Sequence, residues 1–532
     1  MKTLKSILFC LVAFLGFNSV VIATPFSQPT GPILYVKPIP TGSANCTSWD
    51  NACGLQAALD IAAPGNEIWV AAGTYLPTKL SSSTYERSAT FQLESGVAIY
   101  GGFPTDGGEW EERDPVANLT TLSGDIGLPI ISSDNSYNVV TANGVDGTAL
   151  LDGFTIRDGN ASFPFNNGGG MYNQNSSPTL SNLTFANNHA GSSGGGMYNT
   201  SSNPTLTTFT FTGNSAQYGG GMSNRENSSP TLTHGIFIGN STDSVGGGMA
   251  NYSSSPTLTN VTFASNPAES GGGMSNSGSH PSLTNVTFNG NSARTRGGAI
   301  YNFNASNPTL VNVTISENSA VTNGGGILNA HGSSPTLTNA IVWKNLPALN
   351  QIKNEIGSTV MITFSDIESA VVYEGTGNIN LDPLLGILAD NGGFIQTQAL
   401  GAGSPVIDAG NPETCPDADQ RGYHRPINGA GDASEICDMG AYEYGSSAAG
   451  FTLAVQTEGS GHLAIDPAQT AYYFGELVTL TATAAPGWSF TGWGGDATGT
   501  DNPLIVTIEG DMAITSNFQK ALFKYLLFPI FK

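Results

Sequence analysis

Two acidic side chains in the middle of the chain, Asp243 and Glu269, could do acid–base chemistry. They occupy roughly equivalent positions in neighbouring copies of a repeat, so stacking of the copies would bring them side by side. A glycosidase needs two carboxylates that face each other across the scissile bond. A calcium-assisted lyase needs several acids around the ion, with a basic residue beside them. The pair is therefore the first place to look for catalysis.

Few other charged side chains accompany this pair between residues 166 and 345. They are Arg225, Glu226, Arg294, Arg296, Glu317 and Lys344. We identify no charged column opposite Asp243 and Glu269, which favours solvated loop residues over a catalytic pair. The sequence therefore predicts no catalytic residue, no cofactor-binding residue, no cofactor and no metal ligand, and indicates a protein that is not an enzyme.

Four histidines lie in the same region without the spacing of a metal site. His189, His234, His280 and His331 fall at four different positions of the repeat. A zinc site would need two or more of them at ligand spacing. We interpret all four as surface substitutions.

Two acidic stretches outside the repeats offer oxygen ligands for a cation. The first surrounds Trp110 and contains Asp106, Glu109, Glu111, Glu112 and Asp114. The second contains Asp417, Asp419, Asp432, Asp438 and Glu443, with Arg421 and Arg425 nearby. Calcium ligation is one interpretation of each stretch. The first has no spaced ligand motif, so we favour a solvated loop there. For the second we favour charge pairing that fixes a long loop.

Asp243 and Glu269 are positioned by a sequence unit that is repeated seven times between residues 166 and 345. Its clearest copy is SPTLTNVTFASNPAESGGGMSN at 255–276, and copies recur about every 26 residues, a period that indicates stacked repeats. In TLTNVTF, apolar Leu258, Val261 and Phe263 alternate with polar residues and the phase resets at Asn260, which predicts two short strands. A third strand begins at the glycines and points Met274 inward.

Three short strands and three corners per copy predict one coil of a parallel β-helix. Two columns form its predicted core: Leu180, Leu206, Leu232, Leu258, Leu283, Leu310, Leu337 and Phe185, Phe211, Phe237, Phe263, Phe288, Ile315, Val342. Two further columns are asparagine throughout: Asn188, Asn214, Asn240, Asn266, Asn291, Asn318, Asn345 and Asn173, Asn199, Asn224, Asn251, Asn276, Asn302, Asn329. Asparagine tolerates left-handed corners, and stacked amides bond to one another. We therefore predict that both columns turn corners and form ladders along the axis.

The repeat carries a family resemblance. The motifs FTGN at 211–214, FIGN at 237–240, FASN at 263–266 and FNGN at 288–291 are each followed by GGGM or GGAI. They resemble the FxxN and GGAI repeats of the polymorphic outer-membrane protein family. That resemblance implies a right-handed β-helical passenger on a bacterial surface, used in adhesion.

The flanking segments read as two caps and a separate module. Residues 24–88 form the predicted N-terminal cap, with a short helix near 55–62 that covers the first open coil. The β-helix itself extends over 89–403. Residues 404–444, with SPVIDAG, DQRG, RP and DMGAYEY, resemble the closing segment of secreted bacterial β-helix proteins. Beyond a linker at 445–450, residues 451–518 form a small all-β module, followed by an apolar and basic tail at 519–532.

The module contains GWSFTGWGGD and AITSNF, and resembles the divergent internalin-type B-repeat of secreted bacterial proteins. Its aromatic residues Trp488, Phe490 and Trp493 have two interpretations. They could stack on a sugar face, or two of the three could form the core of the module, which we favour.

Several features indicate export. Residues 1–23 read as a signal peptide, and no later stretch has the ~18 apolar residues of a spanning helix. The mature chain keeps an even number of cysteines, for which we predict the local pairs Cys46–Cys53 and Cys415–Cys437; free thiols are the alternative. A net charge of −23 argues against nucleic acid or anionic lipid as a partner.

The sequence thus predicts a secreted or cell-surface all-β protein that acts as an adhesin-like or structural display scaffold. Its partner could be an extracellular glycan, another cell surface or a protein. A polysaccharide lyase or glycoside hydrolase on the same fold is the alternative. A second alternative comes from PTLT, which places two outward threonines on a coil, as in Thr257 and Thr259. Such a TxT grid resembles the face of ice-binding β-helices.

Overall fold

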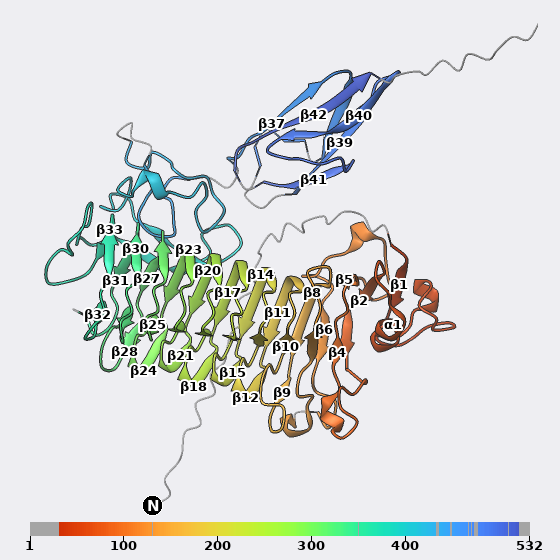
Figure 1. Ribbon diagram of the computed structural model, residues 1–532, viewed down its shortest axis with the longest axis horizontal. Coiled ribbons are helices and arrows are strands. Elements are labelled where there is room, and N and C mark those ends of the chain that lie inside the picture. The colour runs from red at the N-terminus through yellow and green to blue at the C-terminus, as the bar shows by residue number, and fades with distance from the viewer. Residues whose placement is uncertain are drawn as a thin grey trace, which may run out of the picture.

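The computed structural model describes residues 31–520, except 130, 349, 432–435, 447–449, 467, 470, 473–476 and 509. The predicted signal peptide and residues 521–532 of the predicted tail lie outside the described residues. The chain forms a parallel β-helix, which runs in Figure 1 from the orange N-terminal end to the green coils, and a small blue β module outside the stack. The predicted fold class is confirmed.

The N-terminal end of the stack carries the one α-helix of the described chain, α1 (Leu55–Ile61). Leucine, glutamine and alanine favour helix, and the helix ends shortly before Pro64, where the α conformation is disfavoured. Leu55, Ala58 and Leu59 are buried in the same apolar core as the first coils. The predicted cap helix is therefore present.

Each regular coil contains three strands, as predicted, but they are not the three that the pattern placed. The two strands predicted on either side of Asn260 form a single strand, and another lies at 267–270, where none was predicted. In the clearest copy the three strands are β20 (Thr257–Ala264), β21 (Pro267–Ser270) and β22 (Met274–Ser277). Each strand pairs in parallel with its counterpart in the next coil, so that Leu258 lies beside Leu283 and Met274 beside Ile300. The coils therefore stack in the register that the columns of the sequence predict.

Stacking generates three parallel sheets. The long sheet contains β1 (Ile33–Val36), β2 (Glu67–Ala71), β3 (Gly73–Tyr75), β5 (Ala98–Phe103), β6 (Thr120–Ser123), β8 (Leu150–Arg157), β11 (Thr179–Ala186), β14 (Thr205–Thr212), β17 (Thr231–Ile238), β20, β23 (Ser282–Asn289), β26 (Thr309–Val311), β27 (Thr314–Ser316), β30 (Thr336–Thr338), β31 (Ile341–Trp343), β33 (Met361–Thr363) and β34 (Asp366–Ile367). The ten-stranded sheet contains β4 (Phe91–Gln92), β7 (Val140–Asn143), β10 (Met171–Gln174), β13 (Met197–Thr200), β16 (Met222–Arg225), β19 (Met249–Tyr252), β22, β25 (Ile300–Phe303), β29 (Ile327–Asn329) and β32 (Ile352–Asn354). The seven-stranded sheet contains β9 (Asn160–Ala161), β12 (His189–Ser193), β15 (Ser215–Tyr218), β18 (Ser241–Val245), β21, β24 (Ser292–Arg296) and β28 (Ser319–Ala320).

The predicted core columns fill the interior. Leu258, Phe263 and Met274 are fully buried, and the phenylalanine column forms a continuous parallel stack in which Phe237 and Phe263 have ring centroids 4.7 Å apart. Such contacts add aromatic stacking to the burial of apolar area.

Both asparagine columns are buried amide ladders. In one, Asn214 Nδ2 donates to Asn240 Oδ1 at 2.9 Å and Asn240 Nδ2 to Asn266 Oδ1 at 3.1 Å. In the other, Asn251 Nδ2 donates to Asn276 Oδ1 at 2.9 Å. The predicted ladders along the axis are confirmed.

The prediction that both columns turn corners is correct for the first column and wrong for the second. Asn266 lies in the corner between β20 and β21, whereas Asn276 lies within β22. Positive φ angles lie one residue before the first column, at 54° for Ser265, and two residues after the second, at 57° for Gly278. A left-handed residue at the neighbouring position lets the asparagine side chain point inward, where its amide bonds to the next coil. Asn260, by contrast, does take a left-handed φ of 55°, as its phase reset predicts.

The described residues of 394–444, which we call the folded-back segment, lie against the outer face of the long sheet. Thr262 Oγ1 donates to Gln396 O at 3.0 Å, Asn285 Nδ2 to Ala418 O at 2.8 Å, and Asn312 Nδ2 to Asp438 O at 3.0 Å. A hairpin of β35 (Leu385–Ala389) and β36 (Thr397–Leu400) leads into it. The segment therefore covers one side of the later coils.

Five short 3₁₀ turns complete the described secondary structure. They are η1 (Trp49–Asn51), η2 (Glu86–Ser88), η3 (Trp110–Glu112), η4 (Ser132–Asp134) and η5 (Pro412–Thr414). Both predicted disulfides are present, Cys46–Cys53 before α1 and Cys415–Cys437 in the folded-back segment.

The C-terminal module has its own core between two three-stranded sheets. One contains β37 (Leu453–Glu458), β42 (Met512–Lys520) and β40 (Trp488–Gly495); the other contains β38 (Gly461–Asp466), β39 (Leu477–Ala484) and β41 (Leu504–Thr507). Among the described residues no helix is long and apolar enough to cross a membrane.

Candidate functional site

The predicted carboxylate pair lies on the outside of the seven-stranded sheet and is held by an arginine. Arg294 Nη2 lies 2.9 Å from Asp243 Oδ1, and Arg294 Nε lies 3.1 Å from Glu269 Oε2. The three residues come from three successive coils, and all are substantially exposed. The expectation that no charge would face the two acids is wrong, because Arg294 is the next member of their own column. They form a solvated ion triad.

One of the four histidines is not on the surface. His234 is buried, with its ring 4.4 Å from the ring of Phe394 and its Nε2 3.0 Å from Asn260 Nδ2. Burial lowers its pKa to about 4, so the imidazole is neutral at pH 7. The surface interpretation is wrong for His234, because the folded-back segment covers its coil. His189, His280 and His331 are exposed, as predicted.

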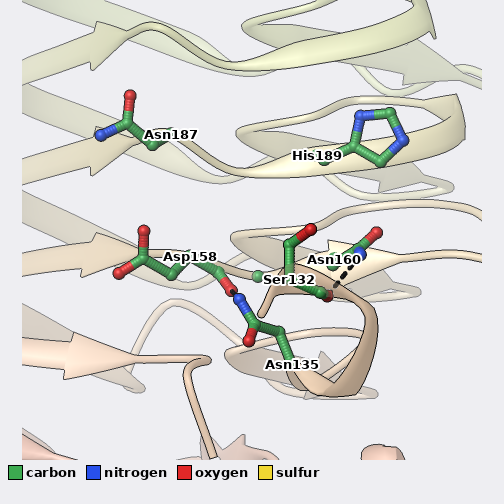
Figure 2. Close-up of a pocket in the computed structure, with 7 residues that line it drawn as sticks. Ser132, Asn135, Asp158, Asn160, Asn187 and His189 are labelled. Atoms are coloured by element: carbon green, nitrogen blue, oxygen red, sulfur yellow. Dashed lines mark hydrogen bonds between the residues drawn. The ribbon is translucent and has the colours of Figure 1, made fainter. Parts of the chain in front are cut away.

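A pocket of about 400 Å³ opens beside the first regular coils (Figure 2). Its lining residues are Ser132, Asn135, Asp158, Gly159, Asn160, Asn187 and His189. Asn135 Nδ2 donates to Asp158 O at 2.7 Å, and Asn160 Nδ2 donates to Ser132 O at 2.6 Å. Two of the three asparagine side chains in its wall therefore form hydrogen bonds that hold the loop around η4 in place.

The pocket brings one carboxylate and one imidazole together, but not as an acid–base pair. Asp158 Oδ2 lies 2.5 Å from Arg157 Nε, and His189 Nδ1 lies 3.0 Å from Ser215 Oγ. Figure 2 shows the Asp158 carboxylate and the His189 ring on opposite sides of the pocket. Although the His189 side chain is exposed at the edge of the pocket, partial desolvation of its ring lowers its pKa. The arrangement suits the binding of a small polar group better than proton transfer.

The acidic stretch of the folded-back segment forms buried charge pairs. Arg421 Nη2 lies 2.6 Å from Asp419 Oδ2, and Arg425 Nε lies 2.7 Å from Glu443 Oε2, with all four side chains almost fully buried. Charge pairing, the interpretation we favoured, is confirmed for these residues. Asp432 lies outside the described residues. Within the described part of the chain, no group of three or more His, Cys, Asp and Glu side chains is arranged to hold a metal ion.

The acidic stretch around Trp110 is an exposed turn anchored by its aromatic residue. Glu109 and Glu112 form a reciprocal capping box around η3. Trp110 packs against Trp69 and Tyr100, with ring centroids 5.6 and 5.0 Å away. The predicted solvated loop is therefore also a structural clamp on the first coils.

A tyrosine–arginine cluster lies on the outer face of the ten-stranded sheet and its corner with the seven-stranded sheet. It consists of Tyr172, Tyr198, Tyr218, Arg225 and Tyr252. Along β16 the inward Met222 and Asn224 alternate with Ser223 and Arg225, whose side chains therefore point outward. The Arg225 guanidinium carbon lies 4.3 Å from the ring centroid of Tyr252 and 5.4 Å from that of Tyr218.

The sequence reasoning missed this cluster, although a signal was available. Outward tyrosines follow the core methionine in MYNQ at 171–174 and MYNT at 197–200. Their column continues as serine and alanine in the next coils, so no single column is aromatic throughout. Tyr218, Arg225 and Tyr252 belong to other columns, and only the coil geometry brings them together.

The aromatic residues of the C-terminal module serve mainly its core. Trp493 is buried, and its Nε1 donates to Asp501 O at 2.6 Å. Trp488 and Phe490 are partly buried against the same core. The interpretation that two of the three residues form the core is confirmed in part, because all three contact the core but only Trp493 is buried.

The outward threonines are arrayed in register on the long sheet. Thr205, Thr231 and Thr257 are exposed and lie beside one another on successive coils. An exposed threonine array is therefore present, although the folded-back segment contacts two of the same coils at His234 and Thr262.

Comparisons with known proteins identify only the C-terminal part of the chain. Residues 451–522 match the divergent InlB B-repeat domain. No curated protein matches the chain.

Three solved structures share a distant likeness in fold. The crystal structure of pectate lyase Pel9A has a TM-score of 0.47 and 14% identity, over 77% of this chain and 96% of that chain. The complex structure of XylC with xylose has a TM-score of 0.39 and 11% identity, over 78% and 99%. The structure of the PL6 family alginate lyase AlyGC has a TM-score of 0.29 and 12% identity, over 80% and 62%. At these scores the likeness carries no argument about activity.

Proposed function

We propose that the chain is an exported, non-catalytic β-helix that acts as an adhesin-like or structural display scaffold, with the C-terminal module as an accessory or spacer. The observation that carries this proposal is the pairing of Asp243 and Glu269 with Arg294. A glycosidase needs two carboxylates that face each other across the scissile bond. Here the same guanidinium binds both carboxylates on an exposed face, so they do not form such a facing pair.

Export is supported by the two disulfides, which form and persist in oxidising compartments. The display role is supported by the way the coil uses its residues. The leucine, phenylalanine and asparagine columns are buried, which leaves the outward columns free to vary without loss of the fold. A partner would therefore meet residues that the architecture does not require.

The test is turnover on a panel of acidic and neutral polysaccharides, measured with the full chain and with Asp243→Ala and Glu269→Ala. We expect no product from any of the three proteins. Product from the full chain that is lost in either variant would overturn the proposal in favour of an enzyme. Thermal hysteresis of the purified protein would instead assign the threonine array to ice binding.

A further inference from the structure

We propose that the tyrosine–arginine cluster binds an acidic polysaccharide, with Arg225 receiving a sugar carboxylate and Tyr252 stacking against a sugar ring. This inference rests on the proposed function in one respect, because it assumes that the ligand is held and not cleaved. It adds a site and a class of ligand to the scaffold.

The first argument is that Arg225 has no carboxylate partner. The other two arginines of the repeats are paired: Arg294 with Asp243 and Glu269, and Arg296 with Glu355 at 3.3 Å. Among the described residues Arg225 forms no ion pair, and its Nε is buried without a hydrogen-bond partner. The guanidinium is a planar fork that matches a carboxylate with two parallel hydrogen bonds, and here that capacity is unused.

The second argument is the aromatic surround. Tyr218 and Tyr252 stand perpendicular with ring centroids 6.0 Å apart, and both contact the Arg225 guanidinium. Cation–π contacts of this kind hold the fork in one orientation before any ligand arrives. Tyr172 and Tyr198 stack 5.5 Å apart on the preceding coils. Rigid tyrosines with an apolar face and a hydroxyl suit the apolar faces and hydroxyls of sugar rings.

The charge of the chain does not oppose this ligand locally. Residues 166–345 contain four basic and four acidic side chains, so the net charge of −23 lies elsewhere in the sequence. Fields from distant charges are screened beyond about 8 to 10 Å at physiological ionic strength. The nearest acid in sequence, Glu226, accepts a hydrogen bond from Thr200 Oγ1 at 2.7 Å.

The experiment measures binding of the full chain to sodium polygalacturonate, to the same polymer with its carboxyl groups methyl-esterified, and to dextran. Variants are Arg225→Met, Arg225→Lys, Tyr252→Ala and, as the matched control, Arg294→Met, which removes the same charge from the repeats. We expect binding to polygalacturonate alone. We also expect at least a tenfold loss of affinity in Arg225→Met and Tyr252→Ala, a partial loss in Arg225→Lys and no loss in Arg294→Met. Melting temperature and product release are recorded for every variant.

Three results would overturn the inference: no binding to the acid polymer, equal binding of the esterified polymer, or equal losses in Arg225→Met and Arg294→Met. A loss of binding in a variant whose melting temperature also falls is checked with Arg225→Lys, which keeps the charge and the stem. If the chain binds the polymer and cleaves it, the proposed non-catalytic function is wrong, but the proposed binding site is still supported. If the chain neither binds nor cleaves the acid polymer, the proposed binding site is wrong and the proposed function is unaffected.

Discussion

The stacked repeats and the folded-back segment bury polar groups in opposite ways. The repeats bury neutral amides and hydroxyls, such as the ladder through Asn240 and Asn266, and keep their ion pairs outside. The folded-back segment buries whole ion pairs, with Arg425 and Glu443 both fully enclosed. Neutral ladders repeat identically on every coil, whereas a buried ion pair needs one specific partner. The first arrangement suits an element that is copied, and the second suits one that must dock in a single place.

The buried pairs are satisfied on all sides, which makes that docking specific. Arg425 Nη1 donates to Asn285 Oδ1 at 3.3 Å and Nη2 to Gly440 O at 3.2 Å. Glu443 Oε1 accepts from Ile427 N at 2.8 Å. Because a buried charge without its partner is costly, a shift of the segment by one coil would be strongly disfavoured.

Placing a charge inside the repeats should have the largest effect. Leu258 is fully buried in the leucine column, so Leu258→Asp puts an unpaired carboxylate among apolar groups. We expect destabilisation of roughly 5 kcal/mol or more, with unfolding of the adjacent coils, measured by urea unfolding and circular dichroism. Leu258→Met is the conservative control. An unchanged unfolding curve for Leu258→Asp would show that the assignment of inward positions is wrong.

Breaking one ion pair of the folded-back segment should come next. Glu443→Ala leaves Arg425 charged and buried, for which we expect a loss of about 3 to 5 kcal/mol and faster proteolysis of residues 394–444. The double variant Arg425→Met with Glu443→Met removes both charges and should be more stable than Glu443→Ala. If the double variant were the less stable of the two, the cost would not come from the unpaired charge.

The sequence predicted the repeats far better than the segment that covers them. A column such as that of Leu258 can be recognised because all seven copies have leucine at that position. The apolar interior requires an apolar side chain there on every coil. The folded-back segment has no sequence repeat. Its charged residues, such as Arg425 and Glu443, are therefore visible in the sequence, but which of them pair with each other is not. The same limit hid the burial of His234 and the cluster around Arg225, since both depend on side chains from different columns or distant segments.

Asp366 should make stability depend on pH at the end of the stack. It is fully buried on β34, with Oδ2 lacking a hydrogen-bond partner, and burial, aided by the charge of Asp382, raises its pKa to about 7. The folded state therefore holds a proton that the unfolded state releases near pH 4. Stability from this group is complete below pH 4 and falls as the pH rises to about 7.

The measurement is the difference in unfolding free energy between Asp366→Asn and the natural chain, taken at several pH values. We expect the advantage of the neutral asparagine to grow by roughly 3 to 4 kcal/mol between pH 4 and pH 8. The comparison cancels the titration of the other groups. A difference that is constant with pH would show that Asp366 is ionised in the folded protein throughout.

Removing one rung of a neutral ladder should have a smaller effect. Asn240 Oδ1 accepts from both the backbone N and the Nδ2 of Asn214, at 3.1 and 2.9 Å. Asn240→Ala leaves these donors buried without partners, for which we expect a loss of about 1 to 3 kcal/mol in urea unfolding. Thr259→Ala, on the outer face of the next coil, is the control. An equal loss in both variants would mean that the ladder adds nothing beyond ordinary side-chain contacts.

The smallest effect should come from the exposed ion triad. Arg294→Ala removes both salt bridges to Asp243 and Glu269, and solvent screens such exposed pairs, so we expect little or no loss of stability in urea unfolding. A double-mutant cycle of Arg294→Ala with Asp243→Ala, at low and high salt, isolates the coupling between the two side chains. A large coupling that persists in high salt would mean that the repeats depend on charge as the folded-back segment does, and the contrast between the two regions would fail. A small, salt-sensitive coupling would instead leave these acids as surface groups whose removal the coil tolerates, because its stability comes from the neutral columns within.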